Sequence, residues 1–325
     1  MAQGRAGRRV LQATLLIALL VLLAAALWTA LAFRRDMKAA YARIEGRSQL
    51  LQTPLGDIEW RDGGQGPPVL VVHGSGGGFD QGELLARTLL PPGWRWIAPS
   101  RCGYLRSTCR PGATFDDQAH AYVALLDHLK IDRVAVVALS HGGPSALLLA
   151  ALHPDRVASL TLVSGGVAAD TSRDHRQADR QGRALMQIYQ HDLLYWTLTH
   201  ALRRTFLQLM GVNDAVIDSL TPAQRALADA VIDGMNPVSP RAAGTRFDHD
   251  AAMPDHRIAA IRAPTLVLHA RDDSLQPFAN AEFAARHVPG ARLQAFDRGG
   301  HLLLAVELAA VRQALQQHLA AHAAP

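Results

Sequence analysis

The stretch that decides the fold reads Val134-Ala135-Val136-Val137-Ala138-Leu139-Ser140-His141-Gly142-Gly143. Its continuous apolar run predicts a strand buried on both faces. The small residues that follow, and the apolar run after them, predict a sharp turn into a helix. This arrangement places Ser140 on a tight elbow, with its hydroxyl exposed above the sheet and facing the helix N-terminus. Ser140 is a candidate nucleophile, although the same pattern also occurs as an ordinary strand-to-helix turn.

Predicted strands and helices alternate on both sides of this elbow, which indicates an α/β fold with a mostly parallel sheet flanked by helices. Two short alternating runs, 49–52 and 57–61, predict an antiparallel hairpin at the sheet edge, closed by Gly63-Gly64. Further strands are expected at 69–72, 96–98, 157–163, 265–269 and 293–296, and helices at 115–130, 144–153, 279–287 and 303–321.

The alternation breaks between about residues 168 and 257. This segment is rich in Arg, Asp, Gln and His, and it carries helical patterns such as 193–209 and 223–232. Because no strand-like run interrupts it, we expect a helical insertion between two strands of the sheet.

Two further candidate groups follow strands at the same predicted edge. Asp272 and Asp273 come just after the strand at 265–269, and His301 follows the last strand on a glycine loop. Ligands bind at the carboxyl ends of strands in open α/β sheets. A serine needs an imidazole to take its proton and a carboxylate to orient that imidazole, and the order Ser, Asp, His supplies these groups.

A glycine-rich loop, His73-Gly74-Ser75-Gly76-Gly77-Gly78, follows the first long buried strand. Its backbone N–H groups can approach a substrate oxyanion closely. No P-loop lysine follows it, so the loop does not indicate a nucleotide site. We interpret His73 as a structural residue of the loop.

Together these features resemble the α/β-hydrolase family, of the type with a helical cap, over roughly residues 48–320. The resemblance implies that Ser140 is the elbow nucleophile and His301 the base. It implies that Asp273 is the acid, because Asp273 lies four residues before Pro277, where members commonly place that aspartate.

The resemblance also implies an oxyanion hole formed by the backbone amides of His141 and of Ser75 or Gly76. The segment Ser100–Tyr104 looks like the family's loop with Arg-x-Gly-Tyr, and the insertion at 168–257 corresponds to its helical cap. Two positions depart from the family pattern, because Ala138 and Ala270 stand where glycine is usual.

The serine at the elbow argues against the haloalkane dehalogenases and epoxide hydrolases of this fold, whose nucleophile is a carboxylate. We therefore predict a serine hydrolase that cleaves a small-molecule ester, a related acyl bond or a C–C bond through an acyl-enzyme. The alternative is a binding protein that keeps the fold without the reaction.

We expect no cofactor and no metal for this chemistry. Asp248, His249, Asp250 and His256 lie in the insertion, but their spacing matches no zinc pattern. We interpret them as part of a solvated polar face.

The N-terminal region predicts a membrane anchor. Residues 10–33 carry no charge, and 24 residues at about 1.5 Å each exceed the ~30 Å of a hydrocarbon core. Arg5, Arg8 and Arg9 precede the segment, which favours a cytoplasmic position for residues 1–9 and an outer-face position for the rest.

A cleaved signal peptide ending near Ala30-Leu31-Ala32 and a buried helix are the alternatives to this anchor. Residues 34–47 are polar and indicate a helical continuation or a linker. The catalytic core is then expected at 48–167 and 258–325, with the cap at 168–257.

The chain has 33 Lys and Arg against 28 Asp and Glu, a formal net charge of +5. Lys38 and Lys130 are the only lysines, and no dense basic stripe with interleaved aromatics indicates nucleic-acid binding. The predicted partners are a small-molecule substrate and a membrane, and the oligomeric state is not indicated. Cys102 and Cys109 could bridge in an oxidising compartment, but we expect two unbonded thiols.

Overall fold

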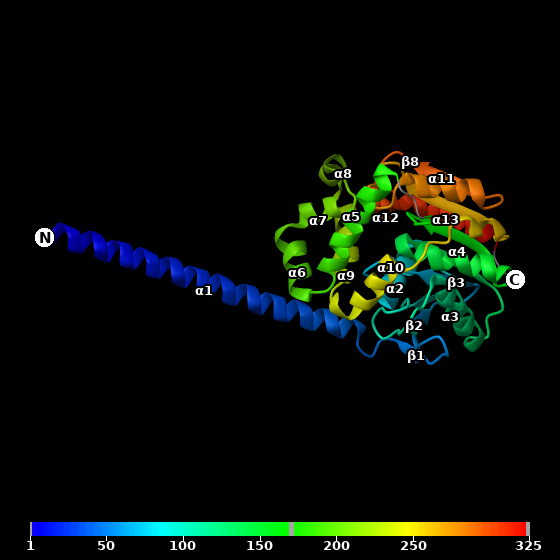
Figure 1. Cartoon of the computed structure of the whole chain (residues 1–325), viewed down its shortest axis with the longest axis horizontal. Helices are drawn as coiled ribbons and strands as arrows, with labels where there is room; N and C mark the ends of the chain where they lie inside the picture. Colours follow the sequence, from blue (N-terminus) through cyan, green and yellow to red (C-terminus); the bar gives the residue numbers. More distant parts are fainter. Residues whose placement is uncertain (1, 169–171, 323–325) are drawn as a thin grey trace. The chain divides into compact units, whose positions relative to one another are not determined.

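The computed structural model describes residues 2–168 and 172–322. The chain forms two compact units, residues 1–43 and residues 44–325. The first unit is a single long helix, α1 (Ala2–Ile44), whose last residue belongs to the second unit (Figure 1). By length and composition α1 can cross a membrane. Of the polar segment 34–47, residues 34–44 continue the helix and residues 45–47 lie beyond its end.

The second unit is built on one mixed eight-stranded sheet with the order β1-β2-β4-β3-β5-β6-β7-β8. Strands β3 to β8 run parallel, while β1 and β2 form the expected antiparallel hairpin at one edge. The strands are β1 (Gln49–Leu51), β2 (Ile58–Gly63), β3 (Pro68–Val72), β4 (Arg95–Pro99), β5 (Val134–Leu139), β6 (Val157–Val163), β7 (Thr265–Ala270) and β8 (Arg292–Phe296).

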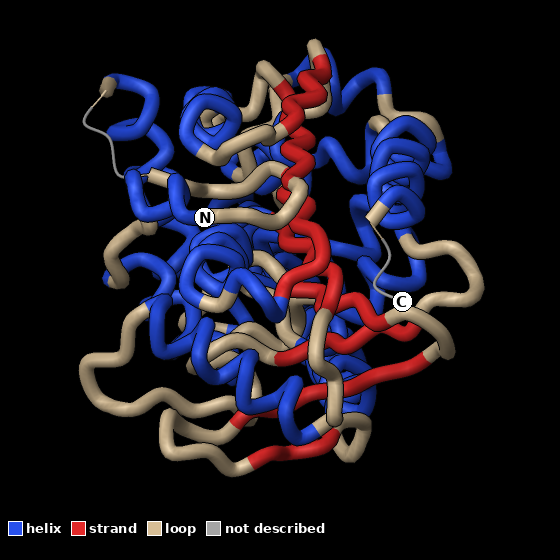
Figure 2. The backbone as a smooth tube through the Cα atoms, turned by 90° about the vertical axis from the view of Figure 1, so that its right-hand side faces the viewer, coloured by secondary structure: helices blue, strands red, loops and turns tan. Residues whose placement is uncertain are grey.

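Helices cover both faces of this sheet, so its central strands are buried on both faces and mostly apolar. Figure 2 shows the strands as one twisted sheet between helices. On one face α3 (Phe115–His128), α4 (Gly143–Leu152) and α11 (Phe278–His287) pack on the core. On the other face lie α2 (Phe79–Leu89), α12 (Leu303–Val306) and α13 (Leu308–Ala321).

Between β6 and β7 the described chain folds into α5 to α10, which we call the helical insertion. Its apolar residues form a third core with residues around α12. The insertion comprises α5 (Arg173–Ile188), α6 (Asp192–Ala201), α7 (Arg203–Leu209), α8 (Asp214–Ser219), α9 (Pro222–Gly234), the 3-10 turn η3 (Ser239–Arg241) and α10 (Ala242–Asp250). A second turn, η4 (Asp255–Ala260), leads back to the sheet.

Several local predictions were wrong. The helix expected at 193–209 is two helices, α6 and α7, that meet at Leu202. The final helix is divided at Glu307, and α2 was not expected at all. Gly63 ends β2 rather than closing the hairpin, whose turn is formed by residues 52–57.

Candidate active site

Ser140 lies on a sharp elbow between β5 and α4. Its φ of 51° falls in the left-handed region, which costs energy in a residue other than glycine and persists only where the surroundings hold it. The elbow packs tightly, because a Cβ atom on Gly142 would lie 2.7 Å from the carbonyl oxygens of Val72 and His73. A short 3-10 turn, η1 (Ser140–Gly142), then leads into α4 and directs the helix N-terminus at the serine.

His301 is held against Ser140 by the turn that follows β8. It lies in the 3-10 turn η5 (Gly300–Leu302), and Gly299 before it has a φ of 142°. The Nε2 atom of His301 is 2.9 Å from the Ser140 hydroxyl, and its Nδ1 atom is 2.8 Å from Asp273 Oδ2. Because an ionised carboxylate only accepts, Nδ1 carries the hydrogen, and Nε2 is the acceptor that faces the serine.

Asp273, rather than Asp272, faces the histidine. Its side chain is buried, and its Oδ1 atom accepts hydrogen bonds from the backbone amides of Leu275 and Gln276 at 3.0 and 2.8 Å. These two bonds fix the carboxylate and leave Oδ2 for the imidazole.

Asp272 serves a different part of the turn. Its Oδ1 atom accepts from the amide of Gly300 at 2.7 Å, and its Oδ2 atom accepts from Asn213 of the insertion at 2.8 Å. Asp272 therefore orders the loop that carries His301, and neither of these two bonds involves the imidazole.

The groups predicted to form the oxyanion hole lie on the other side of Ser140. Among the described residues, the backbone amides of Ser75 and His141 have no hydrogen-bond acceptor. Gly76 has a φ of 74° and lies against the insertion, where an added Cβ would be 3.1 Å from Met235 Sδ and Tyr189 Cε2. Burial lowers the pKa of His141, so its side chain is neutral at pH 7.

A cavity of about 340 Å³ opens over these groups. Ser75, Ser140, His141 and His301 line it on the core side. The insertion supplies apolar side chains to its wall, including those of Leu185, Met186, Tyr189 and Met210, and it also supplies polar ones, including those of His175, Asp179, Arg183 and His249. The cavity can thus hold a small molecule against the serine.

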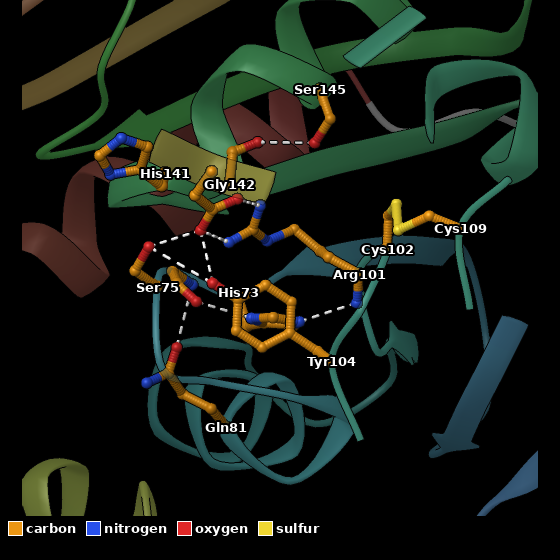
Figure 3. A network of polar contacts seen from close by, with 12 residues as sticks. His73, Ser75, Gln81, Arg101, Cys102, Tyr104, Cys109, His141, Gly142 and Ser145 are labelled. Carbon is orange, nitrogen blue, oxygen red and sulfur yellow. Dashed lines mark hydrogen bonds and ion pairs between the residues drawn. A yellow bond between two sulfur atoms is a disulfide. The ribbon is translucent and has the colours of Figure 1, made fainter. Parts of the chain in front are cut away.

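A buried polar cluster borders the glycine loop (Figure 3). His73 accepts a hydrogen bond from the amide of Arg101 at 2.9 Å, which confirms its interpretation as a structural residue. Arg101 and Tyr104 point toward Ser75. Both side chains also bond to Asp248 of α10.

The expectation that Asp248 lies on a solvated face was wrong, since it is 3% exposed; His249, Asp250 and His256 are exposed. Sequence patterns could not find this contact. Asp248 lies 147 residues from Arg101, and nothing near it in the sequence marks it as buried.

The expectation of two unbonded cysteines was also wrong. Cys102 and Cys109 form a disulfide with a Cα–Cα distance of 5.3 Å. The bridge closes a loop whose backbone bonds to the insertion, because Gly103 accepts from the amide of Gly244 and Leu105 donates to the carbonyl of Pro240. The two cysteines flank this contact in the sequence.

With this geometry in hand, comparison with known proteins identifies the family. The sequence matches the α/β-hydrolase fold family over residues 67–308. The chain therefore belongs to this family and is a hydrolase of the α/β fold.

The chain is similar to both C–C bond hydrolases and esterases. It is 31% identical to the 2-hydroxymuconate semialdehyde hydrolase of Pseudomonas putida, over 74% of this chain and 82% of that protein. It is 30% identical to the pimeloyl-[acyl-carrier protein] methyl ester esterase of Aromatoleum aromaticum, over 72% and 91%. An α/β-hydrolase fold protein of Nakamurella multipartita superposes with a TM-score of 0.61 at 30% identity, covering 84% of this chain and 98% of that one.

Proposed function

We propose that the protein is a serine hydrolase that cleaves a small-molecule ester or a related acyl bond through Ser140, His301 and Asp273. The observation that carries this proposal is the position of His301. Its two ring nitrogens lie 2.9 Å from Ser140 Oγ and 2.8 Å from Asp273 Oδ2, within reach for proton transfer and for orientation of the ring.

In the first half of the proposed reaction, Ser140 Oγ attacks the substrate carbonyl while His301 Nε2 takes the hydroxyl proton. Asp273 stabilises the imidazolium that forms. The backbone amides of Ser75 and His141 donate to the oxyanion as negative charge develops on the carbonyl oxygen. His301 then protonates the departing alcohol, and an acyl group remains on Ser140.

In the second half, water replaces the alcohol. His301 takes a proton from that water as it attacks the acyl carbon. When the bond from this carbon to Ser140 Oγ breaks, His301 gives the proton to Oγ, so that the acid leaves and the serine is restored. These steps use only groups of this chain and water, so the proposal requires no cofactor.

C–C bond hydrolysis is the second candidate, supported by the 31% identity to 2-hydroxymuconate semialdehyde hydrolase. In this reaction a carbon atom replaces the alcohol oxygen as the leaving atom, and it must be protonated as the bond breaks. The same serine, base and amide donors can serve both reactions.

The experiment measures turnover of p-nitrophenyl esters from acetate to dodecanoate, and of 2-hydroxymuconate semialdehyde, with Ser140→Ala as the matched control. Ester turnover that is lost in the variant supports the proposal. Preference for the semialdehyde by several orders of magnitude in kcat/KM favours the second candidate. No turnover of either substrate and no labelling by a fluorophosphonate would favour a non-catalytic binding protein.

We also propose that α1 anchors the protein in a membrane, with the hydrolase unit on the outer face. The support is the length and apolar composition of α1 and the arginines that precede its uncharged stretch. An alkaline phosphatase fused after Pro325 should be active and a fluorescent protein fused there dark. The reverse result would place the hydrolase unit in the cytoplasm.

A further inference from the structure

Two buried ion pairs connect the helical insertion to the core. Arg241 of the insertion pairs with Asp80 of α2 through two bonds of 2.9 and 2.8 Å. Asp248 of the insertion pairs with Arg101, which follows β4. Both arginine side chains are 0% exposed. Asp248 also contacts the loop predicted to form the oxyanion hole.

The carboxylate of Asp248 is saturated with donors. Its two oxygens accept from the two terminal nitrogens of Arg101 at 2.5 and 2.6 Å. Its Oδ2 atom also accepts from the Tyr104 hydroxyl at 2.5 Å and from the Ser75 hydroxyl at 2.5 Å. Burial opposes ionisation, but the charge and hydrogen bonds of Arg101 outweigh it and lower the pKa of Asp248. The group is therefore a carboxylate at neutral pH.

This arrangement explains why a negative charge is tolerated beside the site. A bare carboxylate near a developing oxyanion would raise the energy of the transition state. The bidentate bonds from Arg101 offset that charge, so Asp248 can hold Ser75 without repelling the substrate oxygen.

The glycine loop is held from two sides. On the core side the amide of Gly74 donates to Gln81 Oε1 at 2.9 Å. On the insertion side the Ser75 hydroxyl donates to Asp248. The rotamer of Ser75 is thereby fixed, and its backbone amide stays without an acceptor among the described residues.

We propose that Asp248 is a positioning residue that, through the Ser75 hydroxyl, holds the Ser75 backbone amide toward the substrate oxyanion. This inference rests on the proposed function. It makes the oxyanion side of the site depend on a direct bond to α10 of the insertion, whereas the bonds from His301 to Ser140 and to Asp273 join residues of the core.

The primary test is Ser75→Ala, which removes the hydroxyl but keeps both the amide and the Arg101–Asp248 pair. We expect kcat to fall roughly 10-fold, less than the 10²–10³-fold typical when an oxyanion donor is lost outright. KM should change less than about two-fold, because the interaction acts in the transition state. Inhibition by a phenylboronic acid, whose serine adduct is tetrahedral, should weaken by the same factor as kcat.

Asp248→Asn should lower kcat at least as much as Ser75→Ala does. The variant that carries both changes should have the same kcat as Asp248→Asn alone, because both changes disrupt the same Ser75–Asp248 hydrogen bond. Asp80→Asn is the matched control. It weakens the other buried pair, so it should lower Tm while kcat stays within about two-fold of the wild type.

Wild-type kcat in folded Ser75→Ala, or additive losses in the double variant, would overturn the inference. If Asp248→Asn does not fold, the kcat, the KM and the boronic-acid inhibition of Ser75→Ala are sufficient to test the inference. A wild-type protein that neither turns over esters nor reacts with a fluorophosphonate would overturn the proposed function itself, and this inference with it.

Discussion

The two sides of Ser140 are built differently. On one side, His301 and Asp273 come from loops after β8 and β7, and both belong to the core. On the other side, Ser75 follows β3 but is bonded to Asp248, a residue of the insertion 173 positions away in the sequence. The contacts among Ser140, His301 and Asp273 therefore lie within the core, whereas the Ser75 side includes a direct hydrogen bond to the insertion. The insertion reaches the His301 loop indirectly, because Asn213 donates to Asp272, which accepts from the amide of Gly300.

The two sides also differ in electrostatics. The His301 side joins an imidazole to a side-chain carboxyl group fixed by two backbone amides. The Ser75 side contains a buried ion pair, whose desolvation is costly and whose disruption leaves an unpaired charge. Substitutions on the His301 side should consequently change kcat alone. Substitutions on the Ser75 side should change both kcat and the free energy of unfolding.

The largest effect is expected from Ser140→Ala. Removal of the nucleophile should lower kcat by roughly 10⁴-fold or more, while Tm stays near that of the wild type because only one hydroxyl is lost. Steady-state kinetics with the best p-nitrophenyl ester and a thermal melt measure both quantities. Full activity in this variant would refute the assignment of the nucleophile.

The next effect separates the two adjacent aspartates. Asp273→Asn should lower kcat roughly 10⁴-fold, because the amide favours the wrong tautomer of His301. Asp272→Asn should cost far less, since Asp272 bonds to Gly300 and Asn213 rather than to the imidazole. If kinetics showed Asp272→Asn to be the more harmful change, the two roles would have to be exchanged.

The smallest effect concerns the disulfide, which lies next to the Ser75 side. Cleavage of the Cys102–Cys109 bond should lower the free energy of unfolding by roughly 2–3 kcal/mol, from the loop-closure entropy of a loop of this length. Thermal melts with and without a reductant measure this change, and Cys102→Ser with Cys109→Ser is the control that should not respond. Equal melting temperatures for the oxidised and reduced wild type would contradict the prediction.

The residues on the His301 side of the site could be predicted from the sequence. The elbow and Asp273 follow buried strands, and a buried strand is visible as an apolar run bounded by turn residues. His301 follows β8, a partly exposed strand, and was predicted from the two glycines before it and from its place after Asp273 in the sequence. The parallel sheet then brings the ends of those strands to one edge, so three distant residues could be predicted to meet.

The remaining features depend on contacts that leave no local pattern. Asp248 has polar neighbours in the sequence, and its burial results from Arg101, 147 residues away. The disulfide likewise depends on the fold of a loop that packs against the insertion. Helix α2 was missed because it begins at Phe79, directly after the glycine loop, which the sequence presents as irregular.

Covalent labelling of Ser140 tests the central claim most directly. The purified protein is treated with a fluorophosphonate, and the adduct is located by intact mass and peptide mapping, with Ser140→Ala in parallel. The account predicts a single adduct on Ser140 in the wild type and none in the variant. An adduct on another residue, or equal labelling of both proteins, would contradict it.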